Sequence, residues 1–185
     1  MNHSTPVVSG PWPYPDSRPR YGTVSRLFHW GMALGFAVVF TAALVHFFAH
    51  KSAVDELLWP VHRPTGALLM ALVVLRTLWA LGHARRRPRD NSAAVRWGHR
   101  ALYLLMWAVP TIALLRQYGS GRAFEPFGLP LMAAREGDRI DWMVQLGGLL
   151  HGELGWVLLA LIAGHIGFAF LHRGSSRDVM PRMIG

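Results

Sequence analysis

Four long apolar runs constrain this chain more than any other feature of its sequence. They cover roughly residues 27 to 49, 60 to 82, 101 to 116 and 143 to 171. A helix needs about 20 apolar residues to cross the hydrocarbon core of a bilayer, and most of the runs meet that length. The chain of 185 residues is 52% hydrophobic, with a mean hydropathy of +0.25. We therefore predict an all-α membrane protein, a bundle of four transmembrane helices.

The third run is the shortest, and Pro110 lies near its middle. A proline kinks a helix, but a membrane helix tolerates it where neighbouring helices satisfy the freed carbonyl group, so we count this run as a span. The first twenty residues are polar, rich in proline and lack the apolar stretch of a signal peptide. We expect a flexible tail over 1–20 and one four-helix domain over 21–185.

The charges predict which side of the membrane each end of the chain occupies. The net charge is +9, and Lys51 is the only lysine. If the N-terminus lies inside, the inner segments carry twelve arginines, whereas the outer segments carry five arginines and Lys51. Because basic residues accumulate in cytoplasmic loops, both termini are predicted to be cytoplasmic.

The kind of partner follows from where these charges lie. They occupy short segments beside the spans and form no stripe on a soluble fold, so we expect no nucleic acid partner. The run "RRRPR" at 85–89 suits anionic lipid headgroups. The chain contains no cysteine, which excludes disulfides, iron–sulfur ligation and thiol catalysis.

Two histidines in the fourth run share one helix face. His151 and His165 are fourteen residues apart, which on an α-helix is a rise of about 21 Å and about 40° short of four full turns. His29 lies at the inner start of the first span and His62 at the outer start of the second. The depths therefore match in two pairs, His29 with His165 and His62 with His151.

Paired imidazoles across a helix bundle are typical of a protein that binds a flat macrocycle through both axial positions of its iron. Gly66 and Gly155 each lie one turn after a histidine of the outer pair, where the missing side chain would let a porphyrin approach the backbone. A single histidine within a membrane span is more often a hydrogen-bonded interior group or part of a proton path. Four histidines at matched depths favour two haem groups.

The remaining intramembrane histidines have other expected positions. His46 and His50 are four residues apart at the outer end of the first span, a spacing that also ligates zinc, and we place them at the outer mouth. His99, at the inner start of the third span, competes with His29 and His165 for the inner haem, and we assign it a polar role beside that haem or at a quinone site.

The order and spacing of these motifs resemble the bacterial cytochrome b561 family. The resemblance covers about residues 20 to 185 and rests on "RLFHW", "HRPTGALLMALVVLR", "GHRALYLLMWAVP", the His151/His165 pair and the terminal "RDVMPRMIG". It implies four transmembrane helices that hold two haem b groups, with iron ligated by the pairs His29–His165 and His62–His151. It also implies a location in the bacterial inner membrane and exchange of electrons with the quinone pool.

Three functions remain open at this point. Small free-standing members of the family are similar to superoxide oxidase, which passes electrons from superoxide outside the membrane to ubiquinone. Longer relatives are haem b anchor subunits of hydrogenase or dehydrogenase complexes, so a partner dehydrogenase subunit is an alternative. A histidine-lined metal-ion transporter is the third. The resemblance favours an oxidoreductase of the superoxide:quinone type.

Several charged residues are candidates for roles around the haems. Arg76 follows His62 by fourteen residues and so shares its face at the inner depth, where it could contact a haem propionate or a quinone oxygen, or simply extend to the headgroups. Glu153 lies close to His151 within the span, where a carboxylate needs a partner. Five arginines crowd the outer side and could steer superoxide, neutralise propionates, with Arg63 as the candidate, or pair with nearby acids. They are Arg63, Arg116, Arg122, Arg135 and Arg139.

Overall fold

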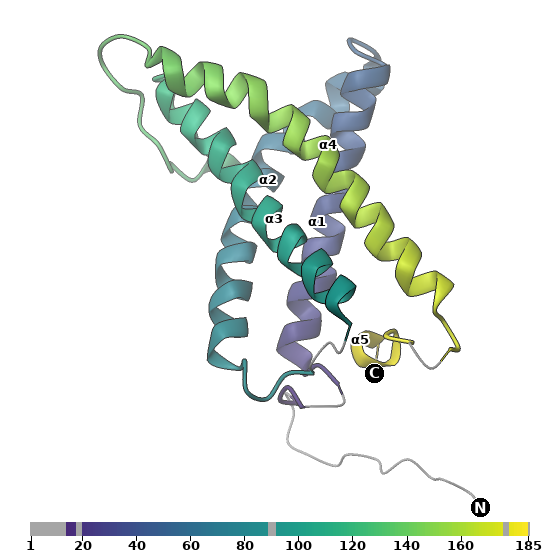
Figure 1. Cartoon of the computed structure of the whole chain (residues 1–185). Helices are drawn as coiled ribbons and strands as arrows, with labels where there is room; N and C mark the ends of the chain where they lie inside the picture. Colours follow the sequence, from purple (N-terminus) through teal and green to yellow (C-terminus); the bar gives the residue numbers. More distant parts are fainter. Residues whose placement is uncertain (1–13, 18–19, 89–91, 176–177, 185) are drawn as a thin grey trace, which may run out of the picture.

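Four long helices make up most of the chain in the computed structural model, which describes residues 14–17, 20–88, 92–175 and 178–184. They are α1 (Thr23–Phe48), α2 (Ala53–Gly82), α3 (Ala93–Gly119) and α4 (Asp141–Leu171), followed by the short α5 (Pro181–Ile184). A single 3₁₀ turn, η1 (Pro126–Gly128), interrupts the connection between α3 and α4 (Figure 1). Each of the four long helices is long and apolar enough to cross a membrane, which confirms the predicted fold class.

Two of the helices are longer than their apolar runs. Helix α2 begins at Ala53, where the side chain of Ser52 accepts a hydrogen bond from the backbone N–H of Asp55 and so caps the first turn. Helix α3 extends over 27 residues and continues through Pro110, so the run that is shortest in sequence does not form a short helix. The extra turns mix apolar with charged residues, such as Glu56 on α2 and Arg96 on α3, so hydropathy alone does not detect them.

The bundle consists of two antiparallel hairpins. Helix α1 packs along α2 and α3 packs along α4, whereas contacts between the hairpins are fewer (Figure 1). Met32 on α1, Val73 on α2 and Leu158 on α4 are the most deeply buried large side chains of a core that all four long helices share. Outside this core, large apolar side chains such as Phe48 and Leu171 are exposed, as expected of a surface that faces lipid.

Glycines set how closely the helices of each hairpin approach. Gly119 on α3 faces Met143 on α4, and a Cβ atom added there would lie 2.5 Å from the Cβ of Met143. Gly147 on α4 is buried against the side chain of Arg116 on α3, where an added Cβ would overlap the Arg116 Cβ. Small residues at such contacts are the usual means of close helix packing in membranes.

The C-terminal residues fold back onto the start of α1, and we call this the terminal end of the bundle. The Arg26 side chain donates to the carbonyl of Ile184 at 2.9 Å, and the Trp30 indole donates to that of Met183 at 3.3 Å. The backbone N–H groups of Gly174 and Met180 donate to the Asp178 carboxylate and hold its pKa below the ordinary value. The α1–α2 turn and the α3–α4 loop lie at the opposite, distal end (Figure 1).

Part of the predicted tail contacts the helices at the terminal end. Asp16 is only 4% exposed and accepts hydrogen bonds from the Gly22 N–H at 2.7 Å and the Ser25 hydroxyl at 2.8 Å. Its carboxylate also lies 3.4 Å from the Arg87 guanidinium. Residues 1–13 and 18–19 lie outside the described residues, so the division between a tail and a four-helix domain stays a prediction.

Gly147→Ala should destabilise the protein, by about 1–3 kcal/mol, because the added methyl group overlaps the Arg116 side chain at the α3–α4 contact. Its neighbour Gly148 is a matched control, since an added Cβ there meets nothing within 4 Å. Gly148→Ala should be neutral or stabilising by roughly 0.5–1 kcal/mol, because alanine favours a helix over glycine. Thermal unfolding in detergent measures both, and equal effects would contradict the packing described for Gly147.

Candidate functional site

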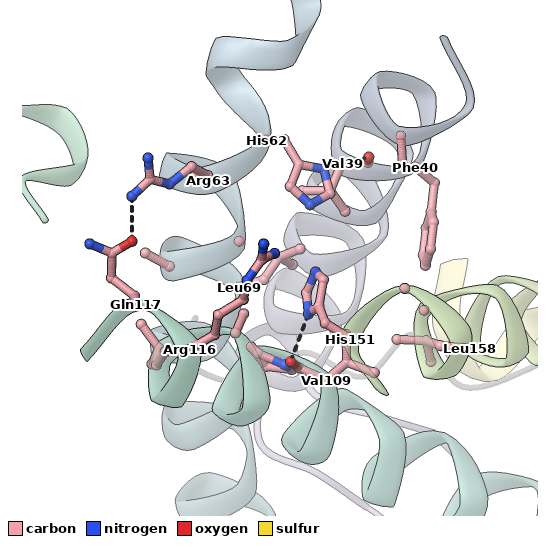
Figure 2. A pocket seen from close by; sticks show the side chains of 18 of the residues that line it. Val39, Phe40, His62, Arg63, Leu69, Val109, Arg116, Gln117, His151 and Leu158 are labelled. Atoms are coloured by element: carbon pink, nitrogen blue, oxygen red, sulfur yellow. Dashed lines mark hydrogen bonds between the residues drawn. The ribbon is translucent and has the colours of Figure 1, made fainter. Parts of the chain in front are cut away.

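Two imidazole rings face each other near the distal end, one from each hairpin. His62 on α2 and His151 on α4 have ring centres 6.2 Å apart with an angle of 88° between their planes (Figure 2). Nδ1 of His62 lies 3.1 Å from the carbonyl oxygen of Val39, and Nδ1 of His151 lies 3.1 Å from that of Val109. We call these two histidines the distal pair.

The hydrogen bonds of the distal pair determine which ring nitrogens are available. A carbonyl oxygen only accepts, so Nδ1 of each neutral ring must carry the proton and donate it. Nε2 of each ring then holds a free lone pair. A second-sphere hydrogen bond of this kind fixes the tautomer and orientation of histidines that ligate metals.

A second pair of rings lies toward the terminal end. His29 on α1 and His165 on α4 have ring centres 6.3 Å apart at 56°, and we call them the terminal pair. His99 on α3 lies beside them, 5.6 Å from the ring centre of His165. Nδ1 of His29 is buried and forms no hydrogen bond within the part of the chain that the structure describes.

The separation within each pair has a simple geometric meaning. A metal–imidazole bond is about 2 Å long and the ring centre lies about 1 Å behind the nitrogen, so two imidazoles on opposite sides of one metal have ring centres about 6 Å apart. Both pairs have this separation. Rings in direct stacking contact would lie closer, as His46 and Trp59 do at 3.6 Å.

The distal pair lines a cavity of about 490 Å³ between the hairpins, within the size range of small-molecule and cofactor sites. Its walls are mostly apolar, with Phe40 and Leu158 among them (Figure 2). Gly66, Gly152 and Gly155 also line it, and a Cβ atom added at Gly66 or Gly155 would meet nothing within 4 Å. The open space that the sequence predicts beside the pair is therefore present.

Comparison with known proteins identifies the family to which this helix bundle belongs. The sequence matches the prokaryotic cytochrome b561 family over residues 20–185. The chain belongs to this family. It is also 30% identical over 189 aligned residues to cytochrome b561 homolog 2 of Escherichia coli strain K12, an alignment that covers 93% of this chain and 95% of that protein. Membership implies haem b and a role in membrane electron transfer.

The residues around the paired histidines of this cytochrome b561 fit a haem b group. The ring separations suit iron between the imidazoles of each pair, and the open glycine faces leave room for a flat ring. The buried Nδ1 of His29 has no hydrogen-bond partner among the described residues. Neutral imidazole is also the ordinary axial ligand of haem iron.

The five arginines that are predicted to lie on the outer side divide into two groups. Arg63, Arg116 and Arg122 line the cavity of the distal pair, and Arg63 also donates to the Gln117 side chain at 2.6 Å (Figure 2). Arg139 instead forms an exposed ion pair with Asp141 at 2.9 Å. Proximity to the cavity therefore favours the first group as partners of an anionic ligand or a haem propionate.

Arg135 belongs with the second group of outer arginines. Its side chain donates to the backbone carbonyl of Asp138 at 2.7 Å and lies over the Tyr118 ring, 6.0 Å from the ring centre. Arg135 does not line the cavity of the distal pair. The ordered α3–α4 loop therefore positions Arg122 differently from Arg135 and Arg139, although all three belong to one stretch of sequence.

Arg76 lies between three helices near the terminal pair. Its Nε donates to the Tyr103 hydroxyl on α3 at 3.0 Å, and its Nη1 lies 3.8 Å from the sulfur of Met32 on α1. The side chain therefore points into the bundle and does not extend to the headgroups. Glu153 is exposed on α4, and none of the ion pairs found among the described residues includes it.

The sequence analysis did not identify Asp55, a polar residue that contacts both His46 and His50. Asp55, in the first turn of α2, lies 2.9 Å from Nδ1 of His46 and 3.4 Å from Nδ1 of His50. The i, i+4 spacing identifies the two histidines, but the contact with Asp55 depends on how the chain turns between α1 and α2. An acid within five residues of such a pair is the available signal in the sequence.

Proposed function

We propose that this cytochrome b561 binds two haem b groups and transfers electrons through the membrane from a periplasmic donor, superoxide, to ubiquinone. His62 and His151 would ligate one iron, and His29 and His165 the other. The observation that carries the proposal is the repetition of one ring separation, 6.2 and 6.3 Å, in two pairs that each have one member on helix α4. Bound haem supplies one-electron redox chemistry.

The protein's own residues would orient and isolate the cofactors. Each ligating ring of the distal pair is held by a backbone carbonyl, which keeps Nε2 directed at its partner. The mostly apolar walls of the cavity lower the local dielectric, which strengthens the electrostatic interactions within it. In such a site, nearby arginines would influence the haem potential strongly.

The basic groups at the distal cavity support an anionic donor. Arg63, Arg116 and Arg122 bring positive charge to the cavity that contains the distal pair. A small anion such as superoxide is attracted by such a cluster, and its association rate then depends on ionic strength. Arg63, through its position beside the cavity, would also neutralise a haem propionate.

The terminal end offers hydrogen-bond donors for a quinone. Arg76 and His99 lie near the terminal pair, and Arg76 is fixed by its hydrogen bond to Tyr103. A quinone oxygen accepts hydrogen bonds from groups of this kind, and its partly reduced form carries negative charge that a guanidinium stabilises. The same two groups could instead contact a haem propionate.

We propose further that the terminal end faces the cytoplasm of a bacterial inner membrane. The start of α1 and the C-terminal residues lie at one end, together with the arginine-rich α2–α3 connection. In the sequence, the segments assigned to this side carry twelve basic residues, against six in the segments assigned to the other side. A C-terminal reporter that is active only in the periplasm should remain inactive, and an active one would reverse the assignment.

Substitution of either member of a pair should remove one haem and leave the other. We expect His62→Ala and His151→Ala to give the same spectrum, and His29→Ala and His165→Ala to give a different one, because each pair shares one iron. Reduced-minus-oxidised spectra with haem quantitation measure this. His99→Ala is the control and should retain both haems. A His99→Ala protein that loses a whole haem, while His29→Ala does not, would contradict the pairing.

Superoxide should reduce the haems rapidly, and the rate should fall as ionic strength rises past about 0.1 M, where the Debye length is about 10 Å. Arg122→Gln should slow this step several-fold because Arg122 lines the distal cavity, whereas Arg139→Gln, whose guanidinium is already paired with Asp141, should change it little. Stopped-flow absorbance of the haem band follows the reaction.

Reoxidation by ubiquinone is the second half of the same experiment. Arg76→Ala should impair it more than reduction, since Arg76 lies near the terminal pair. If superoxide leaves the haems oxidised at every salt concentration, the proposal of a superoxide:quinone reaction is wrong. A role as the haem b anchor of a dehydrogenase complex would then take its place, to be sought as a co-purifying subunit.

A further inference from the structure

We propose that His46, His50 and Asp55 form a binding site for a divalent transition-metal ion at the distal end, separate from the haem ligands. The metal-binding atoms of the three side chains all lie within 4.8 Å of one another. Asp55 is buried, His46 is partly buried and His50 is exposed, so the group is open to solvent on one side. This site does not depend on the proposed reaction with superoxide or quinone.

The turn between α1 and α2 positions the carboxylate. Helix α1 ends at Phe48, and the chain reverses through Lys51, which has a positive φ of 63° that non-glycine residues rarely adopt. The Lys51 N–H donates to Asp55 Oδ2 at 2.9 Å, and Ser52 Oγ accepts from the Asp55 N–H. A strained backbone conformation of this kind persists where the surrounding contacts enforce it. Here the turn directs the Asp55 side chain toward the end of α1.

The two imidazoles are also fixed in orientation. The ring of His46 lies flat on Trp59, with centres 3.6 Å apart and planes at 10°, and the ring of His50 meets His46 edge-on at 4.5 Å. With the rings held in this way, Nδ1 of each faces Asp55, at 2.9 Å for His46 and 3.4 Å for His50. A cation would therefore find three donor atoms that lie within 4.8 Å of one another.

The ligand set determines the class of metal. Two imidazole nitrogens and one carboxylate oxygen suit Zn²⁺ and similar first-row ions, whereas Ca²⁺ and Mg²⁺ prefer sites made of oxygen alone. Three protein ligands leave a fourth coordination position for water or another molecule. Imidazole binds a metal ion only in its unprotonated form, so protons compete with the ion and binding should weaken in acid.

The site lies at the entrance to the distal cavity. His46 and Trp59 both line that cavity, and Trp59 also stacks on His62, with ring centres 5.0 Å apart at 23°. An ion bound at His46 would thus be separated from the distal pair by one indole ring. This arrangement adds positive charge to a cavity that already contains three arginines.

Zn²⁺ binding to the purified, haem-loaded protein in detergent tests the proposal. All proteins carry His3→Ala, so that the histidine near the N-terminus does not contribute, and each is treated with a chelator before equilibrium dialysis against Zn²⁺. We expect one Zn²⁺ per chain in the parent protein. We expect at least about tenfold weaker binding in His50→Ala and in Asp55→Asn, since each lacks one ligand.

His172→Ala is the matched control, because it removes another solvent-accessible imidazole, one that stacks on Phe168 and belongs to no such group among the residues that the structure describes. It should bind Zn²⁺ like the parent. Zn²⁺ should also raise the melting temperature of the parent and of His172→Ala but not that of His50→Ala, because an ion that binds only the folded protein stabilises it. The exposed position of His50 makes this variant informative even if Asp55→Asn fails to fold.

Two results would overturn the site. The first is a parent protein that binds no Zn²⁺ at micromolar concentrations. The second is a His50→Ala protein that binds Zn²⁺ as tightly as the parent. In either case the three residues would form only a hydrogen-bonded link between α1 and α2. Haem content is measured in every sample, because Zn²⁺ that binds His62 and His151 in haem-free protein must not be attributed to the proposed site.

Discussion

An imidazole inside a membrane span has no water to satisfy its nitrogens, and each unsatisfied polar group in hydrocarbon costs several kcal/mol. In the distal pair, the two nitrogens of each imidazole ring have different surroundings. For His62 and His151, one nitrogen donates to a backbone carbonyl of a neighbouring helix and the other faces the partner ring. Each of these hydrogen bonds stays within one hairpin, His62 with α1 and His151 with α3, so it fixes the ring on its own hairpin and leaves the other nitrogen for the opposite one.

The distribution of glycine follows from the same requirement. Within a hairpin, Gly119 and Gly147 let helices approach until side chains touch across the contact. Between the hairpins, Gly66 and Gly155 leave space beside the distal pair. Glycine thus allows close helix contact within a hairpin and leaves open volume between the two hairpins. The number of glycines in a span therefore says little until their neighbours are known.

Periodicity and hydropathy were sufficient to predict the four spans and the matched depths of the histidines. A separation of fourteen residues fixes two rings on one helix face whatever surrounds them, so His151 and His165 could be related from sequence alone. The lengths of α2 and α3 were underestimated because their first turns mix apolar with charged residues, such as Glu56 and Arg96, and because α2 also depends on local capping at Ser52. Hydropathy does not report either effect.

Contacts made through loops and turns could not be predicted. Arg122 and Arg139 were indistinguishable in sequence, and only the folded α3–α4 loop separates Arg122, at the cavity, from Arg139, in an ion pair with Asp141. Asp16 is similar, because a proline-rich segment gives no indication that its carboxylate is buried against α1. These contacts depend on backbone geometry that short sequence patterns do not encode.

The pairing of rings across the hairpins has a consequence for biogenesis. Each hairpin consists of neighbouring helices, so α1 can pack on α2 as soon as both have left the ribosome and entered the membrane. His29 and His165, in contrast, are separated by almost the whole chain, and their ring contact requires the last long helix. We therefore expect the cofactor sites to be completed only after synthesis of α4, so that nascent chains pass through a stage of two inserted hairpins that have not yet acquired haem.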